Sequence, residues 1–168
     1  LALDLMAGGY VPLTNLIANT LSCLLQAPDQ LEALRATPSL TGQAVEEGGR
    51  FEAPNQITSR IAASDLHLAG TAIARGDLVF FLLASGNRDP ALCHDADRFD
   101  LHRPPVRALS VGSGPHASVA GRIVARTAEA AISALLDVTT KLELDGSLDW
   151  SGRTLRVRGL RALPVRLS

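Results

Sequence analysis

Two residues with side chains suited to chemistry lie three positions apart: the carboxylate Glu47 and the guanidinium Arg50. On a helix this spacing places both side chains on one face, where they can form an ion pair. Taken alone, such a pair is typical of a solvated protein surface, where it contributes little to stability. Other motifs in the sequence are needed before a buried, structural role can be assigned to the pair.

A few other polar residues could bind a cation or act as a nucleophile. Asp95, Asp97 and Asp100 lie close together but lack the spacing of an EF-hand, so we expect them to cap a loop. Ser118 does not lie in a Gly-x-Ser-x-Gly turn, and no base or orienting acid can be assigned to it, which excludes hydrolase chemistry. Histidines in polar, turn-rich stretches are expected at the surface, namely His67, His94 and His102. No metal site is predicted.

The composition excludes several classes of function. With 16 basic and 17 acidic residues the formal net charge is -1, so neither nucleic acid nor an anionic membrane surface would be attracted. Aromatic residues make up only 4% of the chain, which argues against base stacking. Cys23 and Cys93 lie far apart and form no Cys-x-x-Cys pair, so we interpret them as reduced thiols of a cytoplasmic protein.

The elements that would position these residues are mostly helices. Apolar residues at helical spacing predict one long helix over residues 1–26. Gly8, Gly9 and Pro12 predict a kink or break in it at residues 8–12, and its polar residues make it a poor membrane span. The pattern further predicts helices over residues 29–36, 41–50, 80–85 and 120–136, and strands within 57–79, 141–144 and 155–167, with an ordered coil over 87–118.

The order of several short motifs resembles the bacterial cytochrome P450 family, from its central long helix to its C-terminus. The motifs are Glu47-x-x-Arg50, Ser59-Arg60, Asn87-Arg88-Asp89-Pro90, Ala96-Asp97-Arg98-Phe99-Asp100, Val111 to Ser118 and Gly159 to Val165. The resemblance covers the whole chain and implies a mainly α fold with small β-sheets (α+β), the C-terminal part of the P450 fold. Residues 1–168 would form a single region, and we expect residues to be missing before Leu1, because the chain begins inside an apolar segment.

The resemblance also implies roles for individual residues. Glu47 and Arg50 would lie on the helix that carries the family's Glu-x-x-Arg motif, and Arg98 would complete a buried network that braces the loop presenting the haem ligand. Arg60 matches the arginine that pairs with a haem propionate. Gly48 and Gly49 stand where leucines are usual, at a cost of about 1 kcal/mol each in helix propensity, so we expect this helix to be locally soft.

The haem loop is where this sequence departs most from the family. The family's loop carries a cysteine whose thiolate binds the iron, and Ser118 stands at that position. A serine hydroxyl stays protonated and is a poor iron ligand. Gly112, Gly114 and His116 are then vestigial loop positions. The alternative, His116 as a replacement iron ligand, is disfavoured because the shape of the family's loop serves a ligand at position 118. We therefore expect no haem and no other cofactor, and Arg60 would be vestigial too.

Two further positions depart from the family's pattern. The long helix of the family carries an acid and a threonine that help deliver protons to bound dioxygen, and here Tyr10 and Val11 occupy these positions. A histidine that would reach a propionate is replaced by Ala108. These losses, beside a retained Glu47 and Arg50, indicate a scaffold kept after its chemistry was lost.

The sequence is similar to haem-free P450-like auxiliary proteins of antibiotic pathways, which pair with a deoxysugar glycosyltransferase and activate it. The resemblance implies a non-catalytic protein, not an enzyme, that binds and activates or stabilises a nucleotide-deoxysugar glycosyltransferase in antibiotic or polyketide biosynthesis. Two alternatives stay open: a P450 monooxygenase-family protein whose haem is held by another residue, or a decayed, inactive fragment. The apolar first helix also predicts that the chain by itself self-associates.

Overall fold

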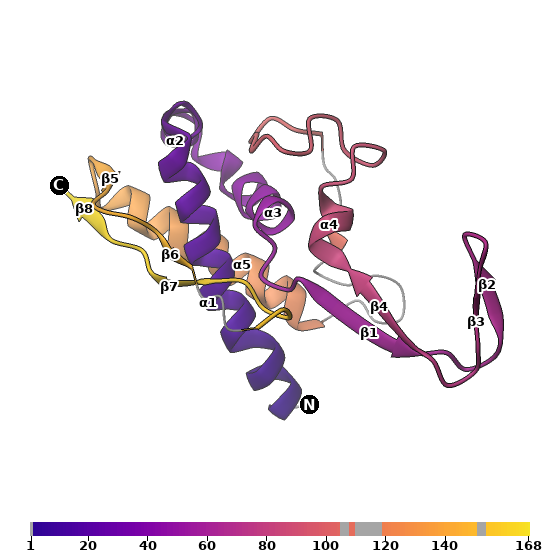
Figure 1. The fold of residues 1–168 in the computed structure, drawn as a ribbon. Coiled ribbons are helices and arrows are strands. Elements are labelled where there is room, and N and C mark those ends of the chain that lie inside the picture. The colour runs from indigo at the N-terminus through magenta and orange to yellow at the C-terminus, as the bar shows by residue number, and fades with distance from the viewer. Residues whose placement is uncertain (1, 105–107, 110–118, 151–153) are drawn as a thin grey trace.

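The computed structural model describes residues 2–104, 108–109, 119–150 and 154–168, and it has the predicted mixture of helices and small antiparallel sheets (Figure 1). The helices are α1 (Ala2–Gln26), α2 (Pro28–Ala36), α3 (Thr41–Phe51), α4 (Leu83–Asn87) and α5 (Val119–Asp137), with a 3-10 turn at Pro38–Leu40. The strands pair as β1 (Ile57–Ile61) with β4 (Leu78–Leu82), β2 (Leu66–Leu68) with β3 (Thr71–Ile73), β5 (Leu142–Leu144) with β8 (Val165–Leu167), and β6 (Asp149–Trp150) with β7 (Leu160–Ala162).

The body of the molecule is built from three helices, since α1 packs against α3 and α5, which also contact each other. Each helix turns an apolar face inward, as amphipathic helices do. The apolar side chains that are at most 1% exposed include Leu24 of α1, Leu34 of α2 and Ile132 of α5. The pairs β5–β8 and β6–β7 lie along one side of this body, and β1–β4 and β2–β3 extend from the other (Figure 1).

The first helix is continuous, so of the kink or break predicted at residues 8–12, the break is wrong. α1 runs unbroken from Ala2 to Gln26 with Pro12 inside it. A proline removes one backbone hydrogen bond, here the bond to the Gly8 carbonyl, but the turns on either side remain bonded. The hydroxyl of Thr14 donates to the Tyr10 carbonyl oxygen at 3.0 Å within the same stretch. One missing donor was therefore insufficient to end a 25-residue helix.

Gly48 has a packing role that the expectation of a soft helix missed. A Cβ atom built on Gly48 would lie 2.2 Å from Thr20 Oγ1 and 3.0 Å from Thr20 Cα, far inside van der Waals contact. Thr20 is fully buried on α1. Gly48 therefore allows α3 to approach the backbone of α1 more closely than any other residue would. Gly49 is less constrained, because its Cβ would meet only the end of the Leu16 side chain, at 3.3 Å.

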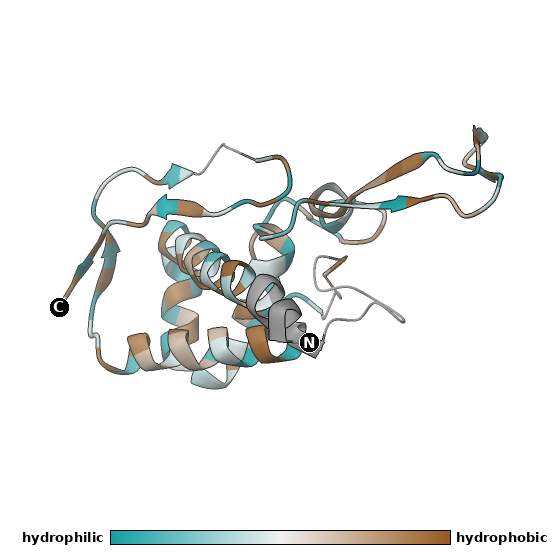
Figure 2. Cartoon of the chain, turned by 90° about the horizontal axis from the view of Figure 1, so that it is seen from below, coloured by the Kyte–Doolittle hydropathy of each residue, from teal (hydrophilic) through white to brown (hydrophobic). Residues whose placement is uncertain are grey.

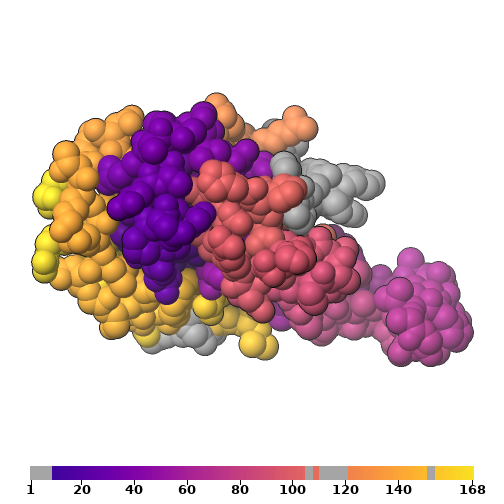
Figure 3. Space-filling model, turned by 90° about the horizontal axis from the view of Figure 1, so that it is seen from above, coloured from indigo at the N-terminus to yellow at the C-terminus, as the bar shows by residue number. Residues whose placement is uncertain are grey.

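The pair β1–β4 forms a projecting arm that the sequence assigned partly to a helix. Residues 80–82 belong to β4, where Phe80 pairs with Ser59 and Leu78 with Ile61. Opposite partners share a face of the sheet, so one face gathers apolar residues from both strands. On this face the exposed fractions are 70% for Ile61, 56% for Leu78, 61% for Phe80 and 57% for Leu82. Figure 2 shows brown, apolar segments along the arm, and Figure 3 shows its tip, β2–β3, standing away from the body.

Within the described residues, no helix combines the length and the apolar character needed to cross a membrane.

Candidate functional site

Glu47 and Arg50 form a buried, two-point ion pair on α3. Arg50 Nε lies 2.7 Å from Glu47 Oε2, and Arg50 Nη2 lies 2.8 Å from Glu47 Oε1. The side chains are 6% and 0% exposed, so the solvated surface pair that the spacing alone favours is not what the structure contains. Burial lowers the pKa of Arg50, but the hydrogen bonds and charge of Glu47 outweigh it, and the net pKa is raised. Arg50 therefore carries its charge in the interior.

The third member of this network is Arg103, not Arg98. Arg103 Nε lies 3.1 Å from Glu47 Oε1, and the Arg103 side chain is 10% exposed. Arg98 is exposed and takes part through its carbonyl oxygen, which accepts from Arg50 Nη2 at 3.1 Å and from Arg103 Nη2 at 2.8 Å. Both arginines belong to one coil, and sequence spacing cannot tell which of them turns its side chain inward. In the sequence, the only sign of this role is that a second arginine, Arg103, follows Arg98 five positions later.

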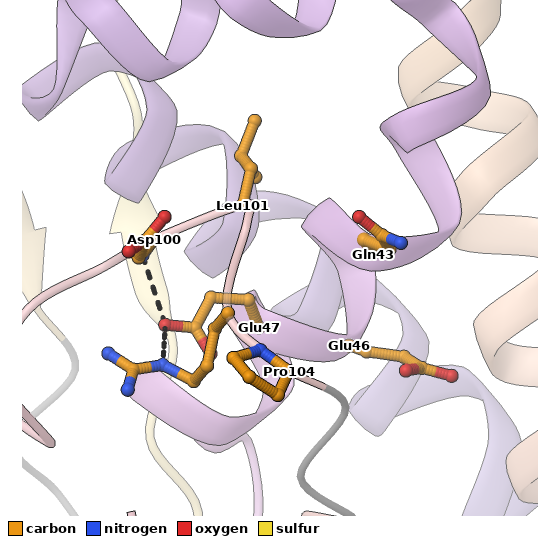
Figure 4. Close-up of a pocket in the computed structure, with 7 residues that line it drawn as sticks. Gln43, Glu46, Glu47, Asp100, Leu101 and Pro104 are labelled. Carbon is orange, nitrogen blue, oxygen red and sulfur yellow. Dashed lines mark hydrogen bonds and ion pairs between the residues drawn. The ribbon is translucent and has the colours of Figure 1, made fainter. Parts of the chain in front are cut away.

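The two guanidinium groups hold the segment over residues 87–103, from the end of α4 onward, by its backbone. Arg50 Nη1 donates to the carbonyl oxygens of Asn87 and Ala96, at 3.0 and 2.8 Å. Arg103 donates to the carbonyl oxygens of His94 and Asp95. The backbone N–H of Asp100 donates to Glu47 Oε1 at 3.0 Å (Figure 4). Charge-assisted hydrogen bonds of this kind fix an irregular segment that has no strand or helix ladder of its own.

The space beside this network is small. It is a hollow of about 20 Å³ lined by polar and apolar groups, drawn in Figure 4: Gln43, Glu46, Glu47, Asp100, Leu101, Arg103 and Pro104. A volume of this size holds about one water molecule and no cofactor. The network of Glu47, Arg50 and Arg103 is therefore a structural brace. We call it the buried brace below.

Arg60 lies on β1 with an exposed side chain. Its Nη1 donates to Thr58 Oγ1 at 3.2 Å and to the Ser59 carbonyl oxygen at 2.8 Å. Among the described residues it has no ion pair with a carboxylate. An exposed guanidinium of this kind can pair with a carboxylate from a bound group.

The described cysteines do not fit the role of an iron ligand. Cys23 and Cys93 are each 3% exposed. Burial first, and then the charge of Glu52, raises the pKa of the Cys23 thiol to about 12, so Cys23 stays protonated at neutral pH. A thiolate is the form that binds metals. Of the loop residues singled out in the sequence, Gly112, Gly114, His116 and Ser118 lie outside the described residues. In the part of the chain that is described, no group of His, Cys, Asp and Glu side chains is placed to hold a metal ion.

Tyr10 and Val11, at the positions of the family's acid and threonine, are both exposed on α1. Their exposed fractions are 73% and 45%. The side chain of Val11 has no group that can donate or accept a proton. Ala108, at the position of the expected histidine, is 7% exposed and offers no hydrogen bond to a propionate. Val11 therefore cannot take part in a proton relay, and the side chain of Ala108 cannot bind a propionate.

Comparisons with known proteins connect the chain to one group of enzymes. It is 40% identical over 162 residues to a biotin biosynthesis cytochrome P450 of Bacillus subtilis, covering 96% of this chain and 41% of that protein. It is 39% identical over 166 residues to the cytochrome P450 monooxygenase PikC of Streptomyces venezuelae, covering 96% and 40%. The solved structure of the ligand-free P450 monooxygenase TamI matches with a TM-score of 0.94 at 36% identity, covering 100% of this chain and 42% of that one. No protein-family model matches the chain.

These findings confirm the predicted fold, the C-terminal part of the P450 fold. The chain spans about two fifths of the length of the curated relatives it matches. The comparisons contradict the expectation that the protein is not an enzyme. One relative named above is described as a cytochrome P450 monooxygenase, and the other as a cytochrome P450 of biotin biosynthesis. One absent sulfur is weaker evidence about function than a likeness that extends over 96% of this chain.

Proposed function

We propose that this chain, a relative of the cytochromes P450 in sequence and fold, is the part of a P450 monooxygenase-family protein that supports the haem-binding side. The observation that carries the proposal is the buried brace, in which Arg50 and Arg103 both pair with Glu47. A buried ion pair is expensive to maintain, because each charge loses its water. Here that cost is met by hydrogen bonds to one coil, which is the arrangement expected where a backbone must be held in place.

The residues of this chain then have separate tasks. The buried brace fixes residues 87–103, and the apolar contacts of α1, α3 and α5 hold the brace in the interior. Arg60 offers a cation for one propionate. When bound, haem supplies the oxygen and electron-transfer chemistry of this family.

Ser118 is where this chain differs from a P450 that binds its iron through cysteine. A serine hydroxyl does not replace a thiolate as an iron ligand, and neither described cysteine is available. We infer that haem, if bound, would have no cysteine of this chain as its iron ligand. A substitution of Ser118 by cysteine would restore the family's ligand at that position.

The proposal is tested by adding haemin to the purified protein, expressed with all of its coding sequence. We expect a Soret band that saturates at one haem per chain, and Ser118→Cys should shift the band of the ferrous carbonyl form to that of a thiolate-ligated haem. Arg60→Gln should weaken haem binding about tenfold, while Arg75→Gln, another exposed arginine of the same arm, should not. No stoichiometric Soret band with either the parent or Ser118→Cys would contradict the proposal.

A glycosyltransferase partner stays a prediction. The relatives named above are described as P450 proteins and not as auxiliary subunits, so they favour the monooxygenase-family interpretation. The partner is tested by immobilising the protein, passing over it purified deoxysugar glycosyltransferases, and measuring both retention and turnover. Retention without any change in turnover would leave binding and remove activation.

A further inference from the structure

Asn87 connects the buried brace to the part of the chain that precedes residues 110–118. It is the last residue of α4 and is 4% exposed. Its backbone carbonyl oxygen accepts from Arg50 Nη1 at 3.0 Å. Its side-chain Oδ1 accepts from the backbone N–H of Leu109 at 2.7 Å. One residue therefore receives a hydrogen bond from the brace on one side and from Leu109 on the other.

Gly86, the residue before Asn87, leaves space for the contact between Asn87 and Leu109. A Cβ atom built on Gly86 would lie 2.7 Å from Leu109 Cδ1, so the absence of a side chain at Gly86 gives Leu109 room beside α4. The other polar atom of the Asn87 side chain, Nδ2, is buried and has no partner among the described residues. An amide group with an unused donor is costly to bury. The acceptor Oδ1 is thus the part of the side chain for which the described structure shows a use.

Leu109 lies directly before the segment that contains the family's iron-ligand position. Residues 108–109 are described, and residues 110–118, which contain the ligand position Ser118, follow at once. We propose that Asn87 is a positioning residue, which fixes the backbone of Leu109 relative to Arg50 and so sets where the chain enters the haem-loop segment. Its importance for haem rests on the proposed function, but the positioning itself does not.

The structure provides a matched reference amide for the test. The backbone N–H of Leu101 donates to Gln30 Oε1 at 2.9 Å, so it is also held by a single side-chain carbonyl, in a different part of the coil. The ratio of the exchange rates of Leu109 and Leu101 therefore cancels any change in global stability. In an Asn87 variant, a change in this ratio reports on the local bond to Asn87.

The experiment is residue-resolved amide hydrogen exchange on the full chain, read by fragmentation mass spectrometry. Asn87→Ala removes the acceptor and should raise the Leu109 to Leu101 ratio about tenfold. Asn87→Asp keeps an acceptor at the same place and should leave the ratio within about threefold of the parent. Gln30→Ala should change the ratio in the opposite direction. A ratio unchanged in Asn87→Ala, or raised equally in Asn87→Asp, would overturn the proposal.

Haem titration of the same preparations separates this proposal from the proposed function. If the parent takes up no haem while the exchange ratio behaves as expected, the proposed function fails and the positioning role stands. If the parent binds haem and the ratio does not move, the positioning role alone fails. Where both hold, Asn87→Ala should bind haem more weakly than Asn87→Asp, because only the alanine variant releases Leu109.

Discussion

Arg103 places its Nε atom 3.1 Å from Glu47 Oε1, joining the coil after α4 to a helix that lies 56 positions earlier in the chain. The same oxygen accepts from Arg50 Nη2 at 2.8 Å. One carboxylate oxygen therefore couples two arginines that reach the same coil from different directions. The predictions below test this contact and other contacts between distant segments.

Arg103→Ala should destabilise the protein by roughly 3–5 kcal/mol, because removing one partner leaves Glu47 buried with less of its charge compensated. Arg98→Ala is the matched control and should change stability by no more than about 0.5 kcal/mol, since only the Arg98 backbone is used. Urea unfolding of both variants measures the difference. Equal losses in the two variants would contradict the assignment of Arg103 to the brace.

Gly48→Ala should cost roughly 1–3 kcal/mol, because the new methyl group overlaps Thr20 and the backbone of α1 cannot retreat without losing other contacts. Gly9→Ala is the control within a helix. Nothing lies within 4 Å of its Cβ position, so the alanine should stabilise the protein by about 0.5–1 kcal/mol. Thermal unfolding compares them. If Gly48→Ala also raised the Tm, close approach of α1 and α3 would not be the reason for this glycine.

Stability should fall at high pH because of Cys23. Burial raises its pKa from 9.0 to about 12 in the folded protein, so between these values the unfolded thiol ionises while the folded one stays protonated. Stability present below pH 9.0 is lost as pH rises toward 12, about 2 kcal/mol of it by pH 10.5. Urea unfolding at pH 8 and pH 10.5 measures this slope. Cys23→Ala should flatten the slope, and Cys93→Ala should retain it; the same slope in both variants would rule out Cys23 as its source.

The 168-residue chain should self-associate through the apolar face of the arm. Phe80 and Leu78 lie on that face, each more than half exposed, beside Ile61 on the paired strand. Phe80→Ser should reduce association at least tenfold, whereas Phe81→Ser, on the opposite face of β4, should reduce it less. Sedimentation velocity over a range of concentrations measures this. A parent chain that is monomeric at all concentrations contradicts the prediction.

Local patterns determined a large part of this fold. Apolar spacing predicted the long helices, because the period of 3.6 residues is a property of the backbone and needs no distant partner. The same geometry brought Glu47 and Arg50 to one face of α3. The order of motifs indicated the P450 fold. Aligning those motifs was enough to show that Ser118 stands where the family has its iron-binding cysteine.

Tertiary structure decided which residues meet across long distances. Whether Arg98 or Arg103 enters the brace depends on how the coil turns above α3, and the need for glycine at position 48 depends on how closely α1 lies to α3. Asn87 reaches Leu109 only because both segments are held against the same interior. Contacts of this kind join residues that are far apart in sequence, and their geometry is set by packing of the whole body, which no local pattern encodes.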